Sequence, residues 1–121
     1  MNNSFLRFRV FDCVKNKYVN NRSARIQTEG NHYIIKVPKN CIIERVTELY
    51  DVNHVPIFEG DVVCQIDSSN FNETHFLEVT WNHIGSLFWL KDSHNNVYTL
   101  RGLGCSYKVI GNIHENPELV E

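Results

Sequence analysis

Hydrophobic and polar residues alternate with a period of two along most of this chain, which is the pattern of half-buried β-strands. In the first such segment Leu6, Phe8 and Val10 fall on one face, and Arg7 and Arg9 on the other. The alternation and the content of β-branched and aromatic residues predict strands over residues 5–11, 18–19, 32–37, 62–66, 75–81, 86–91, 97–101 and 107–113.

In three further segments the period of two is ambiguous or absent. Residues 41–46 fit either a short strand or the first turns of a helix, and we favour the strand because a helix there would be short and has no clear cap. Residues 20–30 have no sustained period, and residues 67–74 are polar, so both are predicted to be loops.

The segment 47–63 is expected to organise the fold, because it joins a predicted turn at 51–54 to a sharp bend at Glu59, Gly60 and Asp61. Gly60 is expected to have a positive φ angle, which glycine adopts without steric cost. Asp61 is expected to accept hydrogen bonds from backbone N–H groups. A second set of structural turn residues is predicted near the end of the chain: Gly111, Asn112 and Pro117.

Strands at this spacing, without a convincing long helix, predict a mainly β fold. We expect a small, strongly bent, partly open β-barrel of SH3-like form with an N-terminal β extension. The 121 residues are predicted to form a single domain. Within it, residues 1–46 would form the N-terminal strands and a loop, residues 47–114 the barrel core, and residues 115–121 a tail.

Composition is that of an ordinary globular protein, with 42% hydrophobic and 21% charged residues. No apolar run approaches the roughly 20 residues that cross a bilayer, and the first residues lack the order of a signal peptide. We therefore expect a cytoplasmic protein without a membrane contact. The four cysteines are widely spaced, without a Cys-x-x-Cys pair, so we expect reduced, buried thiols rather than a zinc site.

Charge is unevenly distributed along the chain. Residues 1–30 carry six Lys and Arg against two Asp and Glu, a net charge of +4, whereas the rest carries six against twelve, a net charge of −6. The basic segment could attract a nucleic acid, or it could dock on the acidic part of a neighbouring subunit. A solvated face with neither role is the third interpretation. The candidate cations are Arg7, Arg9, Lys15 and Lys17.

The residues that could support catalysis or ligand binding do not form a recognisable site. Glu59 and Asp61 are adjacent turn carboxylates, whereas acid–base catalysis needs two carboxyls in different environments facing one pocket. The six histidines form no closely spaced ligand pair, and no serine has the setting of a nucleophile. The sequence predicts no catalytic residues, no metal, no cofactor and no enzymatic activity.

Aromatic residues gather in the predicted hairpin around Trp81 and Trp89. Aromatic side chains on a small barrel can stack nucleobases when basic residues flank them. Here the flanking chain is acidic or neutral apart from three cations, so packing in a core or between subunits is the favoured interpretation. Trp81 and Trp89 are kept as candidate interaction residues.

Four stretches together resemble the YopX family of small proteins encoded in bacteriophages and prophages of low-GC Gram-positive bacteria. They are residues 6–12 (LRFRVFD), 49–61 (LYDVNHVPIFEGD), 79–81 (VTW) and 109–119 (VIGNIHENPEL). The sequence departs from the family at Glu48 and His54, where the family has turn glycines, so we expect a longer or differently shaped turn before Ile57. The resemblance implies a mainly β fold and a phage accessory role, and it brings no catalytic residue set.

Two functional hypotheses remain after these arguments. The first is a non-enzymatic accessory protein that forms a homo-oligomer and binds a host or phage protein. The second is a small-barrel nucleic-acid-binding protein that uses its basic N-terminal segment, including Arg22 and Arg25.

Overall fold

The computed structural model describes residues 8–20, 24–67, 70–82, 84–85, 87–100 and 106–120. These residues form eleven β-strands and a short 3₁₀-helix. The contacts between residues divide the chain into two compact units, Met1–Arg45 and Val46–Glu121. The strand β5 (Cys41–Tyr50) runs from the first unit into the second.

The first unit contains an antiparallel arrangement in which β1 pairs with a strand on each side. The three strands are β1 (Phe8–Asp12), β2 (Lys17–Val19) and the first half of β5 (Cys41–Tyr50). Phe8, Val10 and Phe11 of β1 are buried, and the ring of Phe11 meets that of Tyr18 edge to face at 5.0 Å. The strand predicted over 5–11 is confirmed from Phe8 onward, and the assignment of residues 41–46 to a strand is also confirmed.

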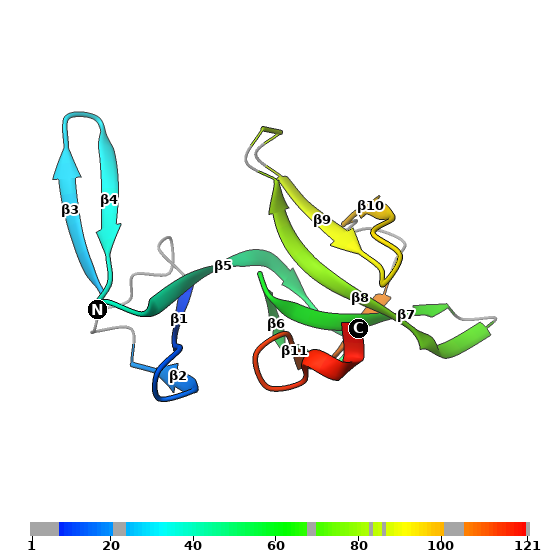
Figure 1. The fold of residues 1–121 in the computed structure, drawn as a ribbon. Coiled ribbons are helices and arrows are strands. Elements are labelled where there is room, and N and C mark those ends of the chain that lie inside the picture. The colour runs from blue at the N-terminus through cyan, green and yellow to red at the C-terminus, as the bar shows by residue number, and fades with distance from the viewer. Residues whose placement is uncertain are drawn as a thin grey trace. The chain divides into compact units, whose positions relative to one another are not determined.

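A separate two-stranded hairpin is formed by β3 (Arg25–Glu29) and β4 (His32–Lys36), as Figure 1 shows. The prediction of β4 is confirmed, but the assignment of residues 20–30 to a loop is wrong over β3. All five residues of β3 are exposed. A strand without a buried face gives no apolar alternation, which is why the pattern did not reveal it.

The second unit is built on an antiparallel five-stranded sheet with the strand order β10-β9-β8-β7-β11 among the described residues (Figure 1). In chain order the strands are β7 (Asp61–Asp67), β8 (Asn70–Asn82), β9 (Leu87–Lys91), β10 (Val97–Thr99) and β11 (Ser106–Asn112). The register shifts between Cys64 and Ile66 and between Val109 and Gly111. Such irregularities bend strands, and they account for the strong curl of this sheet.

The core of the second unit joins the curled sheet to β6 (Pro56–Phe58), a short strand that pairs with the second half of β5. Its buried members are Ile57, Val63, Leu77, Val79, Leu90 and Tyr107. Val62 and Val63 are both fully buried although successive strand residues point to opposite faces. The strand β7, which lies between β8 and β11, is therefore covered on both faces.

The turns predicted for the second unit are confirmed in part. The prediction that Gly60 has a positive φ is confirmed by its value of 89°. Glu48 and His54 have φ values of 71° and 63°, so the two residues that replace family glycines keep the left-handed backbone that glycine favours. The loop predicted over 67–74 is wrong at Asp67, which ends β7, and from residue 70 onward, because β8 begins at Asn70.

The mainly β fold predicted from the strand spacing is confirmed, with a strongly curled half-barrel sheet in the second unit. The SH3-like form of that barrel stays a prediction, as does the assignment of the whole chain to one domain. The chain end differs from a simple tail, because residues Pro117–Val120 form a 3₁₀-helix. Proline suits this position, since its fixed φ fits the first residue of a helix.

Candidate interaction surfaces

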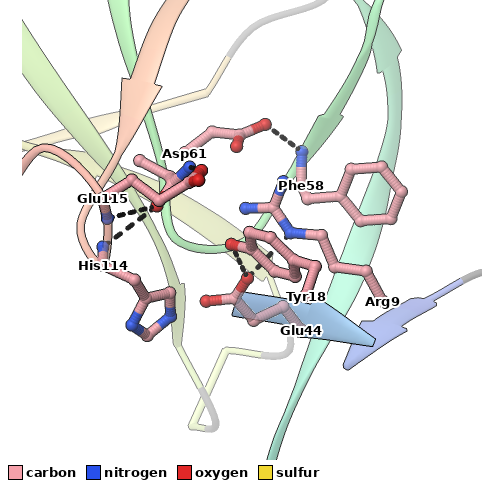
Figure 2. Close-up of polar contacts among 8 residues, drawn as sticks. Arg9, Tyr18, Glu44, Phe58, Asp61, His114 and Glu115 are labelled. Atoms are coloured by element: carbon pink, nitrogen blue, oxygen red, sulfur yellow. Dashed lines mark hydrogen bonds and ion pairs between the residues drawn. The ribbon is translucent and has the colours of Figure 1, made fainter. Parts of the chain in front are cut away.

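In the first unit, Arg9 belongs to a compact polar cluster with Glu44 and Tyr18 (Figure 2). Arg9 and Glu44 face each other across β1 and β5. Arg9 Nε and Tyr18 Oη both donate to Oε1 of Glu44, each at 2.8 Å, and the guanidinium lies 4.4 Å from the centre of the Tyr18 ring. Glu44 is 3% exposed, so this pairing gives an almost fully buried carboxylate an opposite charge and hydrogen-bond donors. The geometry gives Arg9 a structural task, and its role in binding stays a prediction.

The other predicted cations of the first unit have a different setting. Lys15 and Lys17 are exposed, in the turn between β1 and β2 and at the start of β2. Oδ1 of Asp12 shapes this turn by accepting from the N–H groups of Val14 and Lys15, each at 2.9 Å. The Lys15 N–H is the main cause that holds the pKa of Asp12 below its ordinary value. Arg7 and Arg22 lie outside the described residues.

The difference in net charge along the chain is larger when the net charge is counted for each of the two units. The first unit carries nine Lys and Arg against three Asp and Glu, a net charge of +6. The second unit carries three Lys and Arg against eleven Asp and Glu, a net charge of −8. Beyond Arg9, the described cations of the first unit are all exposed: Lys15, Lys17, Arg25, Lys36, Lys39 and Arg45.

The two tryptophans do not form one aromatic platform. Across β8 and β9, Trp81 is opposite Phe88, and Thr80 is opposite Trp89. Neighbouring residues of a strand point to opposite faces, so Trp81 and Trp89 lie on different sides of the sheet. Trp81 packs edge to face on Phe88 with ring centres 4.8 Å apart. Successive bases of a nucleic acid could not stack on both tryptophans from one side.

The carboxylate of Asp61 closes the bend at Glu59, Gly60 and Asp61. Its Oδ2 accepts from the N–H of Phe58 at 2.8 Å, as Figure 2 shows, and Asp61 is 3% exposed. Glu59 is partly exposed. The buried carboxylate of Asp61 therefore accepts a hydrogen bond from the backbone of its own turn, as expected of a structural turn residue.

The turn near the chain end is held by Asn112. Its Oδ1 accepts from the N–H groups of His114 and Glu115, at 3.0 and 2.9 Å, and its Nδ2 donates to Oε1 of Glu115 at 2.6 Å. Figure 2 labels His114 and Glu115, whose backbone N–H groups donate two of these bonds. Gly111 sits where a Cβ atom would lie 2.5 Å from Oδ1 of Asn116, so only glycine fits without displacing that side chain.

Asp51 is the polar residue whose importance the sequence did not reveal. Its Oδ1 accepts from the N–H groups of Asn53 and Val55, at 2.7 and 2.9 Å, and its Oδ2 from that of Val109 at 3.0 Å. Burial acts to raise the pKa of Asp51, but these bonds, above all that from Val109, outweigh it and hold the pKa below its ordinary value. Turn composition predicted the local bonds, and nothing local could predict the partner in β11.

In the part of the chain that the structure describes, the cysteines and histidines do not come together in a metal site. No group of three or more His, Cys, Asp or Glu residues there is placed to hold a metal ion. Cys64 is buried, and Cys41 is partly buried, which raises the pKa of its thiol. The expectation of burial is wrong for Cys13, which is exposed because it lies in the turn after β1. Cys105 lies outside the described residues.

The chain is similar to known proteins in both sequence and fold. The sequence model of a family described as YopX protein matches residues 7–121. The fold is similar to that of YopX from Bacillus subtilis, with a TM-score of 0.58, 19% identity, and coverage of 94% of this chain and 97% of that one. It is also similar to protein EF1440 from Enterococcus faecalis, with a TM-score of 0.56, 24% identity, and coverage of 95% and 97%.

At these identities the two crystal structures establish the fold alone. No curated protein matches the sequence. Among the described residues, no helix is both long and apolar enough to span a membrane.

Proposed function

This chain belongs to the YopX family, and from that premise we propose that it is a non-enzymatic phage or prophage accessory protein that assembles with copies of itself and binds a host or phage protein. It acts in the cytoplasm of the bacterial host. The charge division carries this proposal, because a unit of net charge +6 and a unit of −8 on one chain favour association between copies.

The state of the carboxylates supports an interaction protein rather than an acid–base catalyst. Asp51 and Asp61 are buried acceptors of backbone N–H groups, and Glu44 is neutralised by Arg9. Each stabilises a turn or a strand pairing. General acid–base chemistry instead needs a carboxyl whose pKa is brought near the working pH, and the pKa of Asp51 is shifted in the opposite direction.

The test is the mass of the protein in solution at two salt concentrations. Light scattering after gel filtration should give a mass above the 14.2 kDa of one chain at about 0.02 M NaCl. At about 0.5 M NaCl, where charges are screened beyond a few ångströms, the mass should fall. A mass of one chain at both salt concentrations, up to the highest attainable protein concentration, would exclude self-assembly.

A nucleic acid is the second candidate partner, because the described part of the first unit exposes six cations. Binding to phosphates releases counterions, so the affinity for DNA or RNA would fall steeply with salt. Recovery of partners from host lysate, with and without nuclease, separates the two. A protein that remains bound after nuclease supports the first candidate, and material that is lost on nuclease treatment supports the second.

A further inference from the structure

The β3–β4 hairpin is the part of the first unit that carries the least packing. Its two strands pair only with each other in the described sheets, and every residue of β3 is exposed. An isolated two-stranded hairpin is marginally stable in water at best. A segment of this kind gains stability when another surface covers one of its faces.

The strand register places two isoleucines on one face of the hairpin and two cations on the opposite face, at its open end. Ile26 and Ile35 are directly opposite each other on one face, and Ile26 is 40% exposed. On the other face Arg25 is opposite Lys36, and neither cation forms an ion pair with a described residue. Like charges placed directly across two strands destabilise a hairpin. An acidic partner would relieve this repulsion.

The second unit exposes a surface with the complementary chemistry, in the segment that leads from β5 through the following turn to β6. We call it the 48–55 surface, and its residues are Glu48, Tyr50, Val52 and Val55. The three apolar side chains are 52%, 43% and 43% exposed, and Glu48 is exposed beside them. The 48–55 surface therefore combines exposed apolar side chains with a carboxylate. The hairpin combines exposed apolar side chains with two cations.

The backbone at Glu48 supplies an independent reason to give this carboxylate a role. Its φ of 71° lies in the left-handed region, where a residue with a Cβ atom meets steric strain that glycine avoids. The side chain of Glu48 makes no hydrogen bond or ion pair with the described residues that would offset this strain. Strain that a fold retains at an exposed charged residue points to an interaction outside the folded chain.

From these observations we propose that the β3–β4 hairpin docks on the 48–55 surface of a second copy of this chain. Ile26 and Ile35 cover the apolar side chains. Arg25 and Lys36 leave from the opposite face at the open end of the hairpin, and their long side chains reach around that end to pair with Glu48. The occupant is a protein rather than a nucleic acid, because phosphates would use the cations but leave the apolar face uncovered. It is a second copy because the unit that carries the 48–55 surface has a net charge of −8. The inference rests on the proposed self-assembly and names the surfaces that carry it.

The first experiment exchanges the charges of the proposed pair. Arg25→Glu and Glu48→Lys are each expected to raise the dissociation constant of the assembly about tenfold. The chain that carries both substitutions restores opposite charges and should return to within about threefold of the native value. Arg25→Glu also replaces a like-charge pair in the hairpin by an opposite pair, so a loss of assembly would not come from a weaker hairpin.

The second experiment removes the side chain of Glu48 without damaging the fold. Glu48→Gly relieves the backbone strain, so the thermal midpoint should rise while the dissociation constant also rises. Asn95→Gly is the matched control, because Asn95 has a φ of 66° in the β9–β10 turn. It makes the same kind of backbone change and should leave assembly unchanged.

The outcomes separate this inference from the proposed function. A native chain that stays a monomer at low salt refutes both. A native chain that assembles, but whose dissociation constant does not respond to Arg25→Glu or Glu48→Lys, refutes the docking alone. Additive losses in the double variant refute the pairing of these two surfaces. If Arg25→Glu abolishes DNA binding and leaves assembly unchanged, the hairpin contacts nucleic acid and the docking is also refuted.

Discussion

At the residue scale, Asp51 illustrates how a carboxylate can hold a small fold together. It joins the turn before β6 to β11 through three backbone N–H donors. Asp51→Asn leaves one acceptor oxygen and places an amide N–H₂ against a backbone donor. We expect the free energy of unfolding of the second unit to fall by about 1–3 kcal/mol. Urea unfolding followed by fluorescence reports on this unit, because both tryptophans belong to it.

The pH dependence of the same residue has a definite sign. The folded pKa of Asp51 is lower than the value of about 3.9 in an unfolded chain. Its stabilisation is therefore complete above that value and is lost as the pH falls through the folded pKa. Between about pH 4 and pH 2 the Asp51→Asn variant should lose less stability than the native chain. Equal unfolding curves for the variant and the native chain at pH 7 would show that the three bonds contribute nothing.

At the element scale, the bulge and turn at the end of β11 depend on the absence of one side chain. A Cβ atom at position 111 would lie 2.5 Å from Oδ1 and 2.8 Å from Cγ of Asn116. Asn116 is held in place because its Oδ1 accepts from the N–H of Asn112. Gly111→Ala should therefore lower the free energy of unfolding by about 1–3 kcal/mol, again measured with urea and tryptophan fluorescence.

The control for this prediction is Gly85→Ala in the turn after β8. There the closest atom to an added Cβ is the end of the flexible Leu87 side chain, at 2.9 Å. Leu87 can rotate away, so the change should stay within about 0.5 kcal/mol. If the Gly111→Ala variant were as stable as the Gly85→Ala variant, the Asn116 side chain would have to move at no cost.

Hydrogen exchange should distinguish the β3–β4 hairpin from the buried strand β7. In dilute solution the hairpin amides are expected to exchange much faster, because β3 is exposed whereas Val62 and Val63 of β7 are fully buried. At high protein concentration the hairpin should become protected if it docks on a second copy. Hairpin amides as slow as those of β7 in dilute solution would contradict the marginal stability assigned to this element.

The strands and turns of this fold differ in how far the sequence alone predicts them. Strands such as β1 and β9 were predictable because each buries residues against a core, which leaves a period of two in the sequence. The strand β3 was not, because it has no buried face. The bend at Gly60 was predictable from one residue type, whereas the bond from Val109 to Asp51 joins residues 58 positions apart.

At the scale of the whole molecule, the distribution of charge is the feature that distinguishes the two units. The second unit has a net charge of −8 and the first a net charge of +6, so opposite units of two copies attract each other. Such attraction acts over distances comparable with the Debye length, which is about 10 Å in 0.1 M salt and about 3 Å in 1 M salt. Dissolved salt therefore weakens the attraction between opposite units.

Salt should dissociate the assembly without unfolding the chain. Between about 0.02 M and 0.5 M NaCl at pH 7 the dissociation constant of the assembly should rise about tenfold or more, measured by light scattering over a concentration series. Salt does not break the short hydrogen bonds that Asp51 accepts within the second unit, so the tryptophan fluorescence should not change. An assembly whose dissociation constant is the same at both salt concentrations would be held by apolar contacts alone, and the charge division of the chain would then have to serve another partner.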